Sequence, residues 1–190
     1  MATIAELLAS SLNALKQVQR GEDFTIIKSS DLSRTHIKRL VDNHFLKPII
    51  KGWYVVTDPR ATPGDSTAWY ASFWSFITRY ANERYGNEWC LSAEQSLSIY
   101  TGATIIPNQV LIRAPKGNDY MVPLIPPTSV FNLGAELPSK IDTNNPYNLN
   151  LYTLAEAIIV ATPTMYRNDA LTMRTALAMV HDSSVSYTHL

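Results

Sequence analysis

The run Thr57-Asp-Pro-Arg-Ala-Thr-Pro-Gly64 places two prolines and a glycine within eight residues of an otherwise regularly patterned chain. Proline restricts the backbone and lacks an N–H donor, so neither a helix nor a central strand is expected to continue through such a segment. The sequence therefore predicts a first domain over 1–57, a linker over 58–64 and a second domain over 65–183. The chain has 190 residues, of which 46% are hydrophobic, and this is enough for two small cores.

The first part combines one amphipathic helix with short strands. Apolar residues recur every three or four positions, which predicts a helix that stops at Gly21; they are Ile4, Leu7, Leu8, Leu12, Leu15 and Val18. A strand over 24–27 and a pair of helical segments follow, and the second segment covers 33–43 with an apolar face formed by Ile37, Leu40, Val41 and His44. Residues 46–56 predict a β-hairpin that turns at Lys51-Gly52. This element order is that of a winged helix-turn-helix.

The second part mixes helices with short strands, so the fold class predicted for the whole chain is α+β. Helices are expected over 65–85, from the capping box at Ser92 to Gly102, from the capping box at Thr153 to Ala161, and over 169–181. Strands are expected over 110–113, 120–123, 129–131 and 149–152. The helix over 65–85 is aromatic around much of its girth, which favours a core helix; base stacking on these rings is the alternative.

Positive charge is concentrated in one segment of a chain that is neutral overall. Lys and Arg number 16, as do Asp and Glu, so no global field points to nucleic acid. Between Lys28 and Lys51, however, six cations face only two anions. An angular count that turns Ile37 toward the core points Thr35, Lys38, Arg39 and Asp42 the opposite way, with Arg34, His36 and Asn43 on the flanks.

This pattern predicts that the segment binds double-stranded DNA. Arg and Lys are the usual readers of guanine, and neutralised phosphates supply most non-specific affinity. We expect Arg34, Thr35 and Lys38 nearest the bases; nearer the phosphates we expect Ser30, Ser33, Arg39 and Lys51, with His36 as a further donor. A winged-helix module that contacts proteins through an ordinary solvated face is the alternative.

No pattern of an enzyme, cofactor or metal site is present in the sequence. The motifs HExxH, GxxxxGK[ST], GxSxG and CxxC are absent, and the four histidines lack metal-ligand spacing. The acids Glu94 and Glu156 are explained by their places in first helical turns. The single cysteine, Cys90, excludes an internal disulfide and is expected to be buried. No targeting segment or membrane span is expected, so the predicted location is the cytoplasm. A hydrolase or nuclease in the second domain is a further alternative.

Several runs resemble a known family. Ser30-Asp-Leu-Ser-Arg-Thr-His-Ile-Lys-Arg-Leu-Val41, with Ile50-Lys-Gly-Trp-Tyr-Val55, is similar to the winged-helix head of AbiEi-type antitoxins from type IV toxin–antitoxin systems. Trp89-Cys-Leu-Ser-Ala-Glu-Gln-Ser-Leu97 and Val110-Leu-Ile-Arg-Ala-Pro-Lys-Gly117 are similar to their C-terminal domain. The resemblance implies a DNA-binding transcriptional regulator of a bacterial toxin–antitoxin type system, with a cognate toxin as partner.

The stretch from Met1 to about Asp182 resembles, more closely, the N-terminal region of a group of bacterial Fic-family proteins. In these, a comparable head precedes an AMP-transferase domain, so a regulatory, protein-contacting head with a downstream Fic domain is the alternative function. The Fic motif HPFxxGNGR is absent, so AMP transfer is not assigned to this chain. Residues 184–190 resemble translated sequencing-adaptor sequence, and we predict that they form a non-native tail. The operator and the oligomeric state are left open by the sequence.

Overall fold

The computed structural model describes residues 3–19, 25–62 and 64–180, and its chain divides into two compact units. Unit 1 comprises Met1–Phe76 with Leu124–Pro126, and unit 2 comprises Ile77–Pro123 with Pro127–Leu190. Both units contain helices and strands, so the predicted α+β class is confirmed. The predicted helix stop at Gly21, the strand start at Phe24 and the tail over 184–190 lie outside the described residues.

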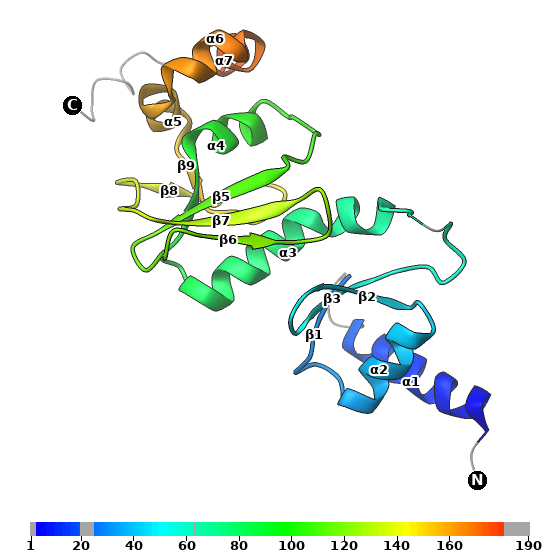
Figure 1. Ribbon diagram of the computed structural model, residues 1–190. Helices are drawn as coiled ribbons and strands as arrows, with labels where there is room; N and C mark the ends of the chain where they lie inside the picture. Colours follow the sequence, from blue (N-terminus) through cyan, green and yellow to red (C-terminus); the bar gives the residue numbers. More distant parts are fainter. Residues whose placement is uncertain (1–2, 20–24, 63, 181–190) are drawn as a thin grey trace. The chain divides into compact units, whose positions relative to one another are not determined.

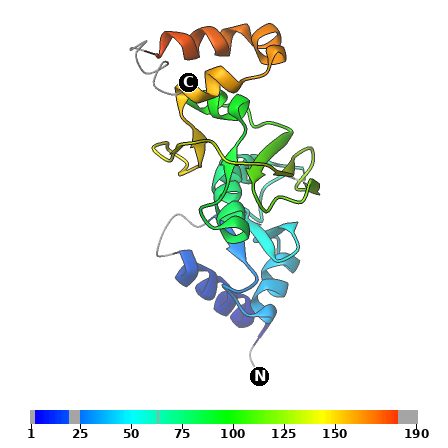
Figure 2. The same cartoon turned by 90° about the vertical axis from the view of Figure 1, so that its left-hand side faces the viewer.

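Unit 1 begins with two helices and a three-stranded antiparallel sheet. Its elements are α1 (Ile4–Gln19), β1 (Ile26–Lys28), α2 (Arg34–Asp42), β2 (Leu46–Ile50) and β3 (Trp53–Val56). The strand order is β1-β3-β2, and α1 and α2 lie side by side next to this sheet (Figures 1 and 2). The predicted hairpin is confirmed: β2 and β3 turn at Lys51-Gly52, where Gly52 has the positive φ of +83° that such a turn requires.

The core of this part joins both helices to the sheet. Its buried members are Leu15, Ile27, Leu32, Ile37, Leu40 and Leu46. The first turns of α1 extend past this core, since Ile4 is 86% exposed. Ile37 and Leu40 anchor α2, and they fix which side of the helix faces solvent.

The helical pair predicted before 43 is a turn followed by one helix. Residues 29–31 form a turn because their polar groups have other partners: the N–H of Ser29 donates to the carbonyl of Gly52 at 2.8 Å, and Asp31 Oδ2 accepts from the N–H of Lys28 at 2.8 Å. Short polar side chains that bond nearby backbone in this way compete with helix formation.

The prediction that His44 shares the apolar face of α2 is wrong. The helix ends at Asp42 with Asn43 as its C-cap, and His44 follows in a left-handed conformation with φ +61°, exposed to solvent. The N–H of His44 donates to the carbonyl of Val41, and the N–H of Phe45 to that of Leu40. These two bonds form a Schellman motif, which reverses the chain into β2 and turns His44 away from the helix face.

The units divide further along the chain than the predicted linker at 58–64. Helix α3 (Thr67–Tyr85) belongs to unit 1 as far as Phe76 and to unit 2 from Ile77. Its first half is the aromatic segment, and Trp69 and Phe73 are buried, as a core helix predicts. The ring of Phe76 meets that of Trp53 edge-on at 5.6 Å between centroids. This packing joins the start of α3 to unit 1.

Unit 2 is built on a four-stranded mixed sheet with the order β4-β5-β7-β6 and a separate pair β8-β9. The strands are β4 (Cys90–Leu91), β5 (Gln109–Ala114), β6 (Tyr120–Pro123), β7 (Ser129–Gly134), β8 (Ile141–Asp142) and β9 (Leu151–Tyr152). The helices besides α3 are α4 (Ala93–Tyr100), α5 (Leu154–Val160), α6 (Pro163–Asn168) and α7 (Ala170–Ala178). The last helix was expected to reach His181; it ends at Ala178, and α6 was not anticipated.

Helices cover the two faces of this sheet (Figure 1). On one face, the buried amide of Asn132 accepts a hydrogen bond from the Tyr85 hydroxyl of α3 at 2.9 Å. On the other face, Gln95 of α4 holds β5, since its Oε1 accepts from the N–H of Leu111 at 3.0 Å. The side chains of Cys90 and Leu97 lie in a buried cluster with residues of α5 and α7.

Candidate nucleic-acid interface

The position of α2 follows from its cap and its two buried anchors. The Oγ of Ser33 accepts a hydrogen bond from the N–H of His36 at 3.3 Å, so Ser33 is the N-cap. Ile37 and Leu40 face the core, on the side of the helix opposite to the polar side chains. The helix therefore presents two flanks, one toward the hairpin and one toward α1.

The flank toward the hairpin carries exposed cations. Arg34, Thr35 and Lys38 are exposed, and within the described residues neither the Arg34 nor the Lys38 side chain has a hydrogen bond or ion pair. The two cations border a hollow of about 340 Å³ between α2 and the hairpin, whose other lining residues are Ile37, Val41, Asp42, Pro48 and Tyr54. This flank combines a mostly apolar floor with two positive side chains on its rim.

The flank toward α1 carries two further predicted DNA contacts, His36 and Arg39. Both are half-buried. Nη1 of Arg39 donates to the carbonyl of Leu7 at 3.0 Å and to Oγ of Ser11 at 2.8 Å. Nδ1 of His36 lies 3.0 Å from the same Ser11 oxygen. The structure thus separates Arg39 and His36 from Arg34 and Lys38.

The remaining predicted contacts lie near the tip of the hairpin. Lys51 is exposed in the turn, and the backbone bond between Ser29 and Gly52 brings the loop after β1 against that turn. Ser30 is exposed beside it, and its hydroxyl donates to Oδ1 of Asp31 at 3.2 Å. Six of the eight predicted residues are therefore exposed: Ser30, Ser33, Arg34, Thr35, Lys38 and Lys51.

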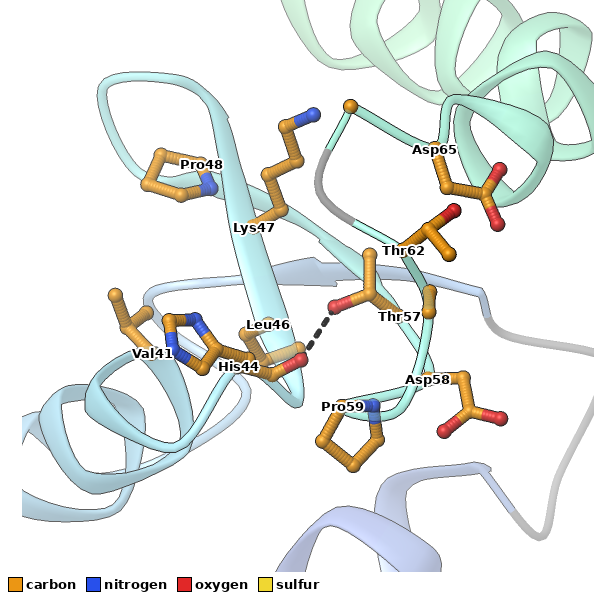
Figure 3. Close-up of a pocket in the computed structure, with 12 residues that line it drawn as sticks. Val41, His44, Leu46, Lys47, Pro48, Thr57, Asp58, Pro59, Thr62 and Asp65 are labelled. Carbon is orange, nitrogen blue, oxygen red and sulfur yellow. Dashed lines mark hydrogen bonds between the residues drawn. The ribbon is translucent and has the colours of Figure 1, made fainter.

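A second hollow, of about 600 Å³, is lined by residues of β2, the end of α2 and the segment 57–65 (Figure 3). The hydroxyl of Thr57 donates to the backbone carbonyl of His44 at 2.7 Å and ties the segment after β3 to the end of α2. Hydrogen bonds from Thr67, with a smaller contribution from the charge of Lys47, lower the pKa of the Asp65 carboxyl. Asp58 and Asp65 line this hollow together with Lys47, and Asp58 is also paired with Arg60 at 3.3 Å, so the lining has no excess of positive charge to attract a phosphate backbone.

Sequence reasoning missed two parts of the region around α2. One is Ser11, a serine at a position where the helical spacing of α1 calls for an apolar side chain; it is fully buried. The other is the pair Pro48 and Tyr54, which line the hollow beside Arg34 and Lys38. The misfit of Ser11 with its apolar stripe was a visible signal, whereas the hairpin side of the hollow depends on the tertiary fold.

Among the described residues, no group of three or more His, Cys, Asp or Glu side chains could hold a metal ion. Burial raises the pKa of the Cys90 thiol to about 12, so this side chain is protonated and shielded rather than nucleophilic. No helix within 3–19, 25–62 and 64–180 has the length and apolar character required to cross a bilayer.

Comparisons of the chain with protein-family models and with curated proteins give no match.

Proposed function

We propose that unit 1 contains a winged helix-turn-helix that binds double-stranded DNA, and that the protein is a bacterial transcriptional regulator of antitoxin type acting in the cytoplasm. The element order helix, strand, helix and hairpin supports this assignment. So does the place of the hairpin, whose turn lies next to the loop that precedes α2. The first helix of the motif is reduced to the turn at 29–31.

In the proposed complex, α2 enters the major groove with its N-terminal half. Arg34, Thr35 and Lys38 reach base edges, because recognition helices contact bases from their first turns. Lys51 at the hairpin tip, with Ser30 and Ser33, contacts phosphates on the flanking backbone. Base contacts confer sequence preference, and phosphate contacts confer affinity and its dependence on salt.

One observation carries the proposal: the side chains of Arg34 and Lys38, one helical turn apart on the flank that faces the hairpin, are exposed and have no hydrogen-bond or ion-pair partner in the part of the chain that the structure describes. An ordinary solvated helix face commonly pairs such cations with acids four residues away. Here Asp42 stands four residues after Lys38 and lines the same hollow, yet within the described residues no ion pair joins their side chains. A neutral protein that leaves two cations beside a hairpin is suited to a polyanion.

The experiment measures binding to the gene's own upstream region and to a random duplex of equal length at matched salt. We expect the wild-type protein to prefer the upstream region. Lys38→Ala should lower specific affinity about 5- to 150-fold and leave random-duplex affinity nearly unchanged, as loss of a base contact does. Lys51→Ala should weaken both and reduce the slope of log K against log salt by about 0.9.

A matched control is Lys140→Ala, which removes an exposed lysine of unit 2 and should change neither affinity nor slope. Equal affinity of the wild-type protein for both duplexes would contradict sequence-specific regulation. Unchanged binding by the Lys38 and Lys51 variants would contradict this assignment of the surface.

A second candidate function, a protein-contacting regulatory head of a Fic-family AMP-transferase, is favoured by unit 2. Large apolar side chains are exposed on and after its C-terminal helices; they are Ile159, Val160, Tyr166, Leu171, Leu177 and Met179. Exposed apolar side chains gathered in one region are typical of protein contacts. Reading the gene beyond codon 183 and finding HPFxxGNGR would favour this function, and a cognate toxin that co-purifies with the chain would favour the antitoxin instead.

A further inference from the structure

Ser11 is a buried hydrogen-bonding hub between α1 and α2. Its side chain is 0% exposed, and its hydroxyl lies 3.0 Å from the carbonyl of Leu7, one turn back in the same helix. Oγ accepts from Nη1 of Arg39 at 2.8 Å and lies 3.0 Å from Nδ1 of His36. A serine thus occupies an apolar position of α1, where its hydroxyl lies within hydrogen-bond distance of two side chains of α2.

Arg39 makes the second link between the helices, since its Nη1 also donates to the carbonyl of Leu7. One guanidinium nitrogen therefore bridges a backbone oxygen and a side-chain oxygen of α1. Hydrogen bonds from a charged donor are stronger than neutral ones, and a group removed from such a half-buried set leaves its partners unsatisfied. If the Arg39 side chain moved to a phosphate, both of these bonds would break. The hydroxyl oxygen of Ser11 would then lose the hydrogen bond that Arg39 donates to it.

We propose that Ser11, His36 and Arg39 form a brace that sets the orientation of α2 for base reading, and that Arg39 is a positioning residue rather than a phosphate contact. The inference rests on the proposed function and deepens it, because it divides the basic face of α2 between two tasks. Arg34 and Lys38 on the hairpin flank meet DNA. Arg39 and His36 on the other flank hold the helix against α1.

The test compares Ser11→Ala, Arg39→Ala, Arg39→Lys and the double variant S11A/R39A. Binding is measured over a range of KCl concentrations, with a duplex selected from a randomised pool by the wild-type protein and with a random duplex. Ser10→Ala, at an exposed position of the same helix, is the matched control for Ser11. Lys51→Ala is the control for a lost phosphate contact. Thermal unfolding followed by tryptophan fluorescence verifies that each variant is folded at the assay temperature.

If Arg39 braces α2, S11A and R39A each lower specific affinity about tenfold and random-duplex affinity much less. The salt slope stays at the wild-type value in both, although R39A has lost a cation. The double variant is no weaker than R39A alone, because the two residues act through one set of bonds. R39K behaves like R39A, since charge without the guanidinium geometry does not restore the brace. Ser10→Ala has no effect.

If Arg39 contacts a phosphate, R39A lowers the slope of log K against log salt by about 0.9, and R39K restores much of that slope. S11A then changes neither affinity nor slope. That result would overturn the brace while leaving the proposed function intact. A reduction of specific and random binding by the same factor in S11A would also overturn it. Absence of any duplex binding by the wild-type protein at low salt would refute the proposed function and the brace together.

Discussion

Ser33 allows the stability of α2 and its contact with DNA to be changed separately. Its Oγ accepts the N–H of His36 at 3.3 Å, a long cap bond on an exposed side chain, so its loss falls in the lower half of the usual range. Ser33→Ala should destabilise unit 1 by about 0.5–1 kcal/mol and lower its Tm by about 2–8 °C. Ser33→Asp should keep the Tm at or above the wild-type value, because aspartate caps as well as serine and its charge favours the helix N-terminus.

DNA binding should show the opposite order. If Ser33 faces a phosphate, an aspartate there lies about 6 Å from it, and at an effective dielectric constant of roughly 40 the repulsion is about 1.4 kcal/mol. This weakens the Kd about tenfold relative to Ser33→Ala, and the difference shrinks as salt is raised.

Both quantities are accessible with the intact chain. Three of its four tryptophans, Trp53, Trp69 and Trp74, belong to unit 1, so intrinsic fluorescence during heating reports mainly on that unit. Fluorescence anisotropy with a labelled duplex gives the Kd at each salt concentration. A Tm loss as large in Ser33→Asp as in Ser33→Ala would refute the capping role. Equal Kd values for the two variants at low salt would refute the placement of Ser33 beside the DNA backbone.

Three further predictions concern unit 2. A methyl group at Gly117 would lie 2.3 Å from the carbonyl of Leu133, so Gly117→Ala should cost at least about 2 kcal/mol in urea unfolding; a wild-type midpoint would contradict the close approach. Because burial raises the pKa of Cys90 to about 12, iodoacetamide at pH 8 should label the thiol only after unfolding, and rapid labelling of the native protein would count against this burial. Burial and the hydrogen bond to Asp142 raise the pKa of Tyr100 in the folded state, so its contribution to stability is full below about pH 10 and is lost above it. Tyr100→Phe should lessen the fall in Tm above pH 10, and an identical fall in both proteins would exclude this effect.

Much of the local structure could be predicted because short-range patterns decide it. The hairpin turn at Lys51-Gly52 follows from a glycine between β-branched runs. The capping boxes at Ser92 and Thr153 start helices as expected, and each hydroxyl accepts the N–H three residues on. The two-residue strands β4 and β8 carry no periodicity and were missed. Helix α6 was missed because its six residues show no apolar stripe, although Pro163 at its start is a typical helix signal.

The amino-acid sequence alone determined the class of fold, most of its elements and the location of the excess positive charge, since each depends on neighbouring residues. The angular count around Ile37 also established that α2 has a polar side. The count could not show which part of that polar side faces solvent. It gives the direction of each side chain from the helix axis, but it does not show which neighbouring elements lie in that direction. Only the packing of α1 against α2 decided that Arg39 and His36 turn to Ser11, whereas Arg34 and Lys38 remain exposed beside the hairpin.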